Sequence, residues 1–343
     1  GAGAWHQGAG FAQPYQESAG VTGRQTSRQA TRQRTRKPSS QRGQVRGRLG
    51  NRNRKRNRRH GPINALKRSW RKANWPTRIK MVLIPTVAVV VVVALVAGLV
   101  RFTNWRAQVR AAEAAQLELT RTYDFNPGNI ISDGQFFNGS AMSQAEVQSF
   151  LDTQGGSLAA MTFDTSNESG EGLCADYTGT KGESAAAIID QSARACKVSQ
   201  KVLLTVMQKE QHLVTAVDPS DYQLMAAMGL NCPDTADCDP AYAGFFRQVY
   251  GAAKRYRYYL EHEEQYGYTA HNLNYIQYHP NAACGGAQVY IENKATALLY
   301  IYTPYQPNIA ALAAGNGTGD SCSSYGNRNF ALIYTSWFGS PRS

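Results

Sequence analysis

One carboxylate in this 343-residue chain lies where a helix should bury its side chains. In residues 199–217 the apolar residues recur at the spacing of one helix face, namely Leu203, Val206, Met207, Leu213, Val214 and Val217. Glu210 falls within that stripe, whereas Lys201 and Lys209 point elsewhere. A carboxyl group in apolar surroundings retains its proton more readily, and a protonated carboxyl can act as a general acid. The pattern therefore indicates Glu210 as a candidate acid catalyst.

A structural role for Glu210 competes with this interpretation. Carboxylates are rarely buried unless they are paired or functional, and Glu210 could form an ion pair with Arg194 or Arg247 or lie at the edge of the stripe. Periodicity alone favours the structural role. Catalysis requires the carboxyl in an open groove, whereas a structural carboxyl can be covered or ion-paired.

A resemblance strengthens the catalytic interpretation. Residues 202–210 have the form Val-Leu-Leu-x-Val-x-x-x-Glu, which resembles the catalytic helix of lytic transglycosylases and lysozyme-like muramidases. In that family a single Glu protonates the glycosidic oxygen and later accepts a proton from the sugar's own 6-hydroxyl group, so the resemblance implies this role for Glu210. Gln211 replaces the family's usual Ser. Residues 228–231 and 278–282 are the nearest counterparts of the family's Gly-Leu-Met-Gln and Tyr-Asn-Ala-Gly segments.

Tyrosines supply the candidate contacts to substrate. Tyr275 and Tyr278 fall in residues 272–283, whose composition predicts a loop, and loops concentrate ligand-contacting residues. Their flat amphipathic rings suit stacking against sugars, although core packing explains most other tyrosines of this chain. We therefore predict substrate binding near Gln211, Tyr275 and Tyr278.

A second acid would be needed for ordinary glycoside hydrolysis. The candidates are Asp218, Asp221, Asp234, Asp237 and Asp239, although the aspartates flanking Cys232 and Cys238 are typical of turns. A transglycosylase needs no second acid, so we favour that chemistry over hydrolysis.

Neither a metal nor another cofactor is expected. The stretch 261–264 is not a zinc-protease helix, because the second histidine, required four residues after His262, is Tyr266. His212, His271 and His279 lack the spacing of metal ligands.

Residues 81–100 are a candidate transmembrane helix. They are 20 residues without a charge, enough to cross a bilayer core of about 30 Å. Residues 1–80 hold 21 of the 37 Lys and Arg and one acid, for a net +20, whereas residues 101–343 carry a net −7. The positive-inside rule places the N-terminus in the cytoplasm and the rest outside. No small-residue cleavage site follows, which favours an uncleaved signal anchor.

The basic tail of residues 1–80 is expected to be disordered, because its long Arg-, Gln- and Gly-rich stretch can bury no core. Such a tail is suited to anionic lipid of the inner leaflet, or to RNA or DNA phosphates. The competing interpretation is a solvated tail that only sets the topology.

Six cysteines lie beyond the apolar segment, and an even number in an exported domain predicts disulfides. The short loop between Cys232 and Cys238 makes that pair the simplest assignment. Cys174–Cys196 and Cys284–Cys322 would complete an ordered set, but fifteen pairings exist and the sequence does not choose among them.

The elements indicate a mostly α fold. Capping boxes at 143–146 and 180–183, an N-cap at Ser199, and helical periodicity over 242–260 and 293–302 predict helices. We expect a helical stalk over residues 101–122 and one lysozyme-like extracytoplasmic domain with disulfides over residues 123–343. Residues 126–133 and 325–330 also resemble extracytoplasmic proteins of actinobacteria.

The predicted function is a membrane-anchored enzyme that cleaves peptidoglycan glycan strands. The alternative is a non-catalytic cell-envelope module that binds glycan or a partner protein on the same scaffold.

Overall fold

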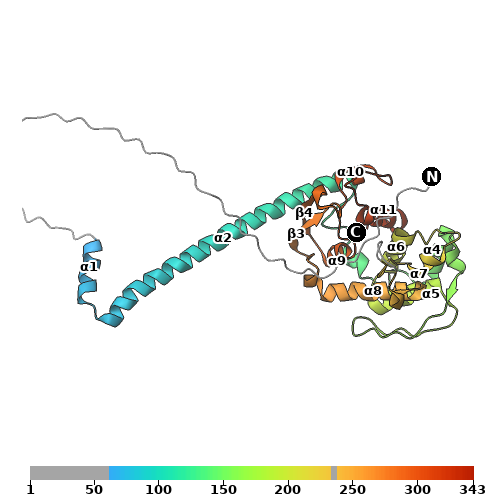
Figure 1. The fold of residues 1–343 in the computed structure, drawn as a ribbon, viewed down its shortest axis with the longest axis horizontal. Helices are drawn as coiled ribbons and strands as arrows, with labels where there is room; N and C mark the ends of the chain where they lie inside the picture. Colours follow the sequence, from blue (N-terminus) through green and yellow to red (C-terminus); the bar gives the residue numbers. More distant parts are fainter. Residues whose placement is uncertain (1–61, 233–237) are drawn as a thin grey trace, which may run out of the picture. The chain divides into compact units, whose positions relative to one another are not determined.

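The computed structural model describes residues 62–232 and 238–343 (Figure 1). These fall into two compact units, residues 62–103 and 104–343. The predicted tail over residues 1–61 and the candidate acids Asp234 and Asp237 lie outside the described residues.

The first unit contains helix α1 (Pro62–Lys72) and the start of helix α2 (Trp75–Tyr123). The prediction of a disordered tail through residue 80 is therefore wrong for these residues. Pro62 occupies the first helical position, where its fixed φ and missing N–H favour a helix start. Ile63, Leu66 and Trp70 recur at helical spacing.

Helix α2 contains the whole apolar segment of residues 81–100. By its length and composition, α2 could cross a membrane, and it is the one such helix in the described part of the chain. The side chains of residues 82–100 are exposed among the described residues, and Met81 is half-buried. The helix continues without interruption through residues 101–122, the segment of the predicted stalk.

The second unit is mostly helical, as predicted, and 58% of all residues in the ranges 62–232 and 238–343 are helical. Its helices are α3 (Asp133–Phe136), α4 (Gln144–Gln154), α5 (Ala185–Cys196), α6 (Gln200–Gln211), α7 (Asp221–Met225), α8 (Phe245–Glu261), α9 (Lys294–Tyr302), α10 (Ile309–Ala313) and α11 (Gly326–Phe338). Short 3-10 turns lie at Ser157–Ala160, Pro240–Tyr242, Glu263–Gln265 and Ala282–Cys284. Helix α5 packs against α4 and α8, and α11 packs against α6.

Two small antiparallel sheets complete the unit. Strand β1 (Thr162–Phe163) pairs with β2 (Glu183–Ser184), and β3 (Asn272–Gln277) pairs with β4 (Gly286–Ile291). The expectation that residues 272–283 form a loop is therefore wrong for the first six of them. Burial alternates along β3, with Asn274 and Ile276 buried and Tyr275 exposed, and this alternation stabilises a hairpin that lies against the core.

Local capping explains where several helices begin. Ser143 and Glu146 form the predicted capping box of α4. Helix α5 instead begins after Ser184, whose hydroxyl accepts a hydrogen bond from the N–H of Ala187. The second predicted capping box is wrong, because Glu183 accepts hydrogen bonds from the Tyr177 hydroxyl (2.9 Å) and from Thr165 (2.8 Å).

Helix α6 is shorter than the apolar periodicity suggests. Ser199 is its N-cap, as predicted, but His212 adopts a left-handed conformation (φ 53°) and ends it after Gln211. Leu213 and Val214 are still buried beyond the helix, whereas Val217 is exposed and does not belong to the stripe. Glu210 consequently lies in the last turn.

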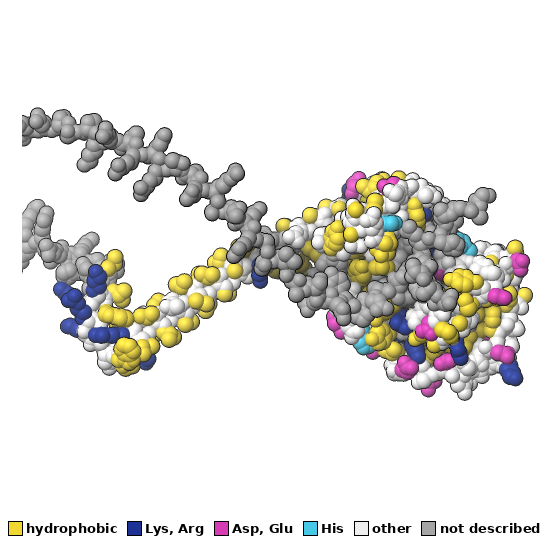
Figure 2. Space-filling model, viewed as in Figure 1, with side chains coloured by type: hydrophobic (Ala, Val, Ile, Leu, Met, Phe, Trp, Pro, Cys, Tyr) yellow, Lys and Arg dark blue, Asp and Glu magenta, His cyan; other side chains and the backbone are white. Residues whose placement is uncertain are grey.

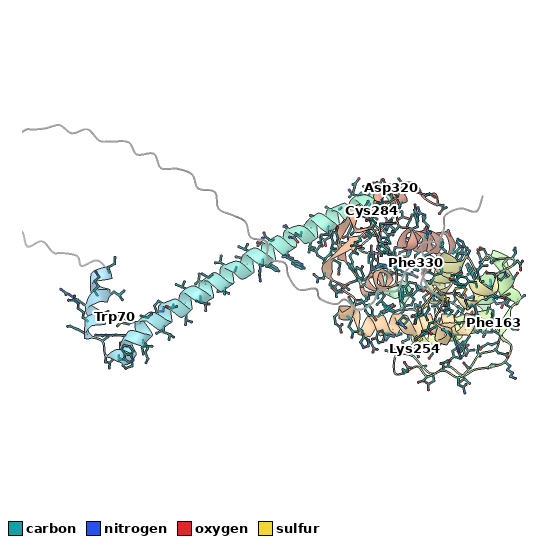
Figure 3. The ribbon with its side chains drawn as sticks, in the orientation of Figure 1. Trp70, Phe163, Lys254, Cys284, Asp320 and Phe330 are labelled. Atoms are coloured by element: carbon teal, nitrogen blue, oxygen red, sulfur yellow. A yellow bond between two sulfur atoms is a disulfide. The ribbon has the colours of Figure 1, made fainter. Side chains whose placement is uncertain are left out.

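Three disulfides form, in the ordered set Cys174–Cys196, Cys232–Cys238 and Cys284–Cys322, and no described cysteine is free. The expectation of disulfides is confirmed. Figure 3 shows Cys284 beside the loop that carries Asp320, two residues before its partner Cys322.

The domain begins before Tyr123. Ala112 and Gln116 of α2 are buried, and the Gln116 side chain accepts a hydrogen bond from the N–H of Tyr290 (2.8 Å) and donates one to its carbonyl oxygen (3.2 Å). The last turns of α2 are therefore hydrogen-bonded to the β3–β4 hairpin and belong to the folded unit.

Candidate functional site

Glu210 lies in a covered position at the C-terminal end of α6. Its side chain is 10% exposed, and the ammonium of Lys209 lies 2.5 Å from its Oε1 atom. No donor among the described residues reaches Oε1 in hydrogen-bond geometry, so the ion pair is its closest recorded polar contact. One oxygen of this carboxyl is therefore buried with an ion pair, and no recognised hydrogen bond, as its polar contact among the described residues.

The expectation that Lys209 points away from Glu210 is wrong. Its side chain is only 7% exposed, its Nζ donates a hydrogen bond to Thr303 Oγ1 (3.2 Å), and it lies 5.4 Å from the centre of the Tyr302 ring. Because the helix ends two residues later, the long side chain can pack along its end. The sequence offered Arg194 as a partner for Glu210, but Arg194 pairs with Asp190 (2.9 Å).

The turn at residues 228–231 packs against the Glu210 carboxyl. Gly229 has φ +70°, and a Cβ added there would lie 3.3 Å from the Cγ, Cδ and Oε2 atoms of Glu210. The buried Gln248 side chain fixes this turn, because its Oε1 accepts from the N–H groups of Met228 and Leu230 and its Nε2 donates to the Leu230 carbonyl. Only glycine allows the backbone to approach Glu210 this closely without strain.

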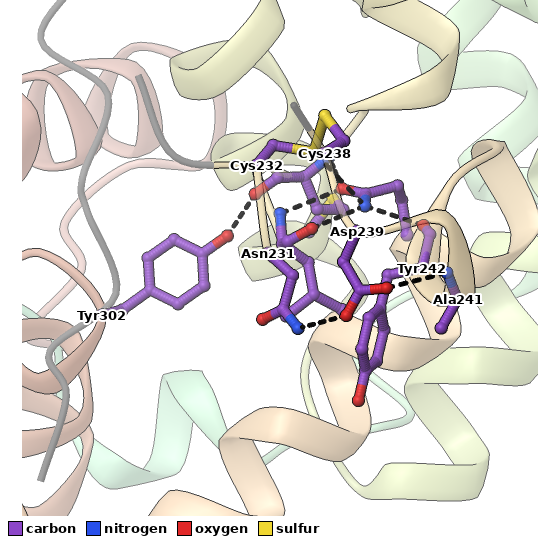
Figure 4. Close-up of a disulfide and its surroundings, with 10 residues drawn as sticks. Asn231, Cys232, Cys238, Asp239, Ala241, Tyr242 and Tyr302 are labelled. Carbon is purple, nitrogen blue, oxygen red and sulfur yellow. Dashed lines mark hydrogen bonds between the residues drawn. A yellow bond between two sulfur atoms is a disulfide. The ribbon is translucent and has the colours of Figure 1, made fainter. Parts of the chain in front are cut away.

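Two buried tyrosines face Glu210. The hydroxyl of Tyr302 donates to the Met228 carbonyl (Figure 4), and the rings of Tyr302 and Tyr256 stack with their centres 5.1 Å apart. Burial, and then the negative charge of Glu210, raises the pKa of each phenol well above its ordinary value. Both phenols therefore stay neutral. The Tyr256 hydroxyl has no hydrogen-bond partner among the described residues.

Gln211 is half-buried next to Glu210, and its carbonyl accepts a hydrogen bond from the Gln223 side chain (2.7 Å). This bond attaches the end of α6 to α7.

Tyr275 and Tyr278 lie on the hairpin. Tyr275 is 54% exposed and Tyr278 is half-buried; burial, and then the nearby Tyr275, raises the pKa of the Tyr278 phenol. Residues 303–306 connect this hairpin to the Glu210 region, since Thr303 contacts Lys209 and the N–H of Gln306 donates to the Gln277 carbonyl (3.0 Å).

The candidate second acids include one turn former. Asp239 accepts hydrogen bonds from the N–H of Ala241 (3.0 Å) and from the Asn231 side chain (3.3 Å), as Figure 4 shows. Asp218 and Asp221 are exposed, and Asp221 lies in the first turn of α7.

Another concavity lies elsewhere on the domain. A pocket of about 450 Å³ is lined by residues 163–166 and by the start of α8, where the rings of Phe163 and Phe245 stack with centres 4.3 Å apart. Asp164, Ser166 and Arg247 add polar groups to its wall. Within residues 62–232 and 238–343, no three His, Cys, Asp or Glu side chains lie close enough to hold a metal ion.

Four residues of the Glu210 region were not predicted as site residues: Lys209, Gly229, Tyr256 and Tyr302. Lys209 was assigned to another face, and the resemblance to the family turn indicated Gly229 only as part of a segment. Tyr256 and Tyr302 gave no local signal, because only the packing of α8 and α9 brings them to the end of α6.

Comparison with known families identifies a match over most of the second unit. Residues 129–343 match the family model described as LasA, N-terminal domain. The searches of curated proteins and of solved structures return no match.

Proposed function

Because the chain belongs to the LasA N-terminal domain family, we propose that it is a membrane-anchored cell-wall protein that acts on peptidoglycan. LasA is a peptidoglycan-cleaving staphylolytic protease, so family membership supports the cell wall as the location and peptidoglycan as the substrate. The matched residues cover almost all of the second unit, from Asn129 to the last residue given.

The anchor in this proposal is the apolar part of α2. Its exposed side chains suit a lipid environment, and the net +20 before it and −7 after it favour a cytoplasmic N-terminus. The disulfides of the second unit fit an oxidising compartment outside the membrane.

For the chemistry, we propose that Glu210 is the general acid and base of glycan-strand cleavage. The observation that carries this is the Oε1 atom, whose polar contact among the described residues is the Lys209 ammonium, so displacement of Lys209 would leave this atom to a substrate oxygen. The protonated carboxyl would give its proton to the glycosidic oxygen as the bond to the sugar's anomeric carbon breaks. The resulting carboxylate would then take the proton of the same sugar's 6-hydroxyl, whose oxygen closes onto that carbon.

This scheme requires that Lys209 be displaced from Glu210. Its ammonium compensates the carboxylate charge and lies against Oε1, so it must move away before a substrate oxygen can reach that atom. A substrate that enters beside Gly229 would displace it, with Thr303 as the alternative contact for the amine.

The test is incubation of the full chain with purified sacculi, with the products read by mass spectrometry. Glu210→Gln should abolish fragment release and leave sacculus binding intact, because it preserves size but removes the proton donor. Glu264→Gln, at an exposed position, is the control and should behave as the unmodified chain. Products should end in 1,6-anhydro-muramic acid; reducing ends would indicate hydrolysis with a second acid.

A non-catalytic binding module is the second candidate. The 10% exposure of Glu210 and its ion pair with Lys209 favour it, because these are properties of a structural carboxylate. The pocket beside Phe163 and Phe245 offers aromatic and polar groups to a glycan. In this case no variant releases fragments, and Asp164→Ala lowers binding to sacculi whereas Glu210→Gln does not.

A further inference from the structure

Helix α1 has two chemically different faces. Ile63, Leu66 and Trp70 form an exposed apolar stripe, and Trp70 is 42% exposed. The basic side chains Lys67, Arg68, Arg71 and Lys72 occupy much of the remaining circumference. Figure 2 shows these dark blue side chains gathered on α1 next to the yellow apolar ones. A short helix of this kind is suited to the boundary between water and a membrane.

The start of α2 extends this apolar face. The Nε of Arg78 donates to the Trp70 carbonyl (3.1 Å), and its guanidinium lies 5.9 Å from the centre of the Trp70 ring, which links the two helices. Figure 3 labels Trp70 at this position. A groove of about 540 Å³ lies there, lined by Trp70, Trp75, Arg78, Ile79, Val82 and Leu83.

Charge and polarity identify the ligand that fits. The groove is apolar apart from Arg78 and Thr86, and it continues into the apolar segment of residues 81–100. The α1 cations beside it attract anionic headgroups, and each basic residue close to an anionic surface strengthens binding about fivefold. Trp70 and Trp75 have the amphipathic rings that occur where a membrane span meets the headgroups.

We propose that α1 and the first turns of α2 form a binding site for an acidic phospholipid. One acyl chain lies in the groove, and the phosphate contacts Arg78 and the cations of α1. The site rests on the proposed membrane anchor and adds lipid selectivity to it. An RNA ligand would use the cations but leave the apolar stripe and groove without a role.

The experiment uses the full chain in nanodiscs of phosphatidylcholine and phosphatidylglycerol, with Trp70 as the fluorescent reporter. The other tryptophans are changed to Phe. Two samples have the same ratio of the two lipids. In one sample the phosphatidylglycerol carries bromine on its acyl chains, and in the other the phosphatidylcholine does; bromine quenches tryptophan fluorescence at close range. We expect brominated phosphatidylglycerol to quench Trp70 more strongly than brominated phosphatidylcholine.

The variants make the result specific. The preference should disappear in the triple variant Arg68→Gln, Arg71→Gln, Lys72→Gln. It should persist in a matched triple variant at exposed positions further along α2, Arg101→Gln, Arg110→Gln, Arg121→Gln. Equal quenching by both labels overturns the acidic-lipid site, and so does single-stranded RNA that removes the quenching.

A second reporter separates this inference from the anchor itself. With Trp70 also changed to Phe, Leu95→Trp places the only tryptophan in the apolar segment. Quenching of this reporter by both labels shows that α2 is in the bilayer, and an unquenched Trp70 in the companion sample then overturns the lipid site alone. If the Leu95→Trp reporter is not quenched, the proposed anchor fails as well.

Discussion

Two charged side chains of low exposure, Glu210 and Arg328, are compensated differently in the domain. Glu210 has the ammonium of the adjacent Lys209 at 2.5 Å. Arg328, 2% exposed, has its guanidinium 4.3 Å from the Tyr325 ring, and its Nη1 donates to the carbonyls of Ala311 and Gly317, each at 2.9 Å. Neutral carbonyls thus hold Arg328, which joins α11 to the end of α10, whereas an opposite charge compensates Glu210.

Replacing Arg328 by Met should destabilise the domain by about 3 kcal/mol, because two carbonyls lose their donors in a buried place. The free energy of unfolding from urea titration of residues 104–343 measures this. Arg342→Met is the matched control, since Arg342 pairs with the exposed Asp124, and its cost should stay below about 1 kcal/mol. Equal costs for the two variants would contradict this account.

Burial raises the pKa of Tyr334 from 10.0 to about 12. Its hydroxyl donates to Gln135 Oε1 (2.9 Å) and joins α11 to α3. Because the unfolded chain ionises at lower pH than the folded one, the contribution of Tyr334 to stability is complete below pH 10 and is lost as the pH rises through 12. Tyr334→Phe should therefore make the alkaline decline in unfolding free energy less steep. An unchanged decline would assign it to other groups.

At the scale of elements, the site depends on a turn whose backbone, at Gly229, packs against the Glu210 side chain. The turn at residues 228–231 is fixed by Gln248 from α8, and Gly229 fits against Glu210 only because it has no side chain. The β3–β4 hairpin is fixed in a similar way by Gln116 from α2. Buried glutamines thus connect elements that are distant in the sequence.

Changing Gly229 to Ala should cost about 1–2 kcal/mol for the left-handed backbone and should also displace the Glu210 carboxyl. Gly172→Ala is the matched control, because Gly172 also has positive φ (79°) but has no atom within 4 Å of an added Cβ. Urea unfolding should show a similar loss for both variants. Only Gly229→Ala should lower fragment release from sacculi, and a similar loss of activity in both would remove the turn from the site.

At the scale of the whole molecule, charge and apolarity divide the chain at residues 81–100. Residues 1–80 before this segment carry a net +20, and the disulfide-containing part that follows carries a net −7. If α2 crosses the membrane in the proposed orientation, everything after residue 100 is outside the cell.

Protease added to intact protoplasts should therefore digest the domain and leave an epitope placed at the N-terminus intact. Western blotting with one antibody for each end measures this. Lysed protoplasts serve as the control, in which both ends are accessible. Protection of the domain in intact protoplasts would reverse the orientation and place the disulfides in a reducing compartment.

The sequence by itself determined the features that depend on near neighbours in the chain. Ser143 and Ser199 cap helices because an N-cap side chain bonds to a backbone group two or three residues away. The apolar segment and the even cysteine number likewise need no tertiary information. These features gave a mostly α fold with disulfides, and the structure confirms both.

The tertiary structure decided the surroundings of Glu210. Periodicity placed Glu210 in a buried stripe, but it could not show that α6 ends at Gln211 or that Lys209 turns back to the carboxyl. The neighbours Gly229 and Tyr302 come from distant segments, and their approach depends on how α8 and α9 pack. Burial and ion pairing are set by such long-range contacts, and a pattern of near neighbours carries no information about them.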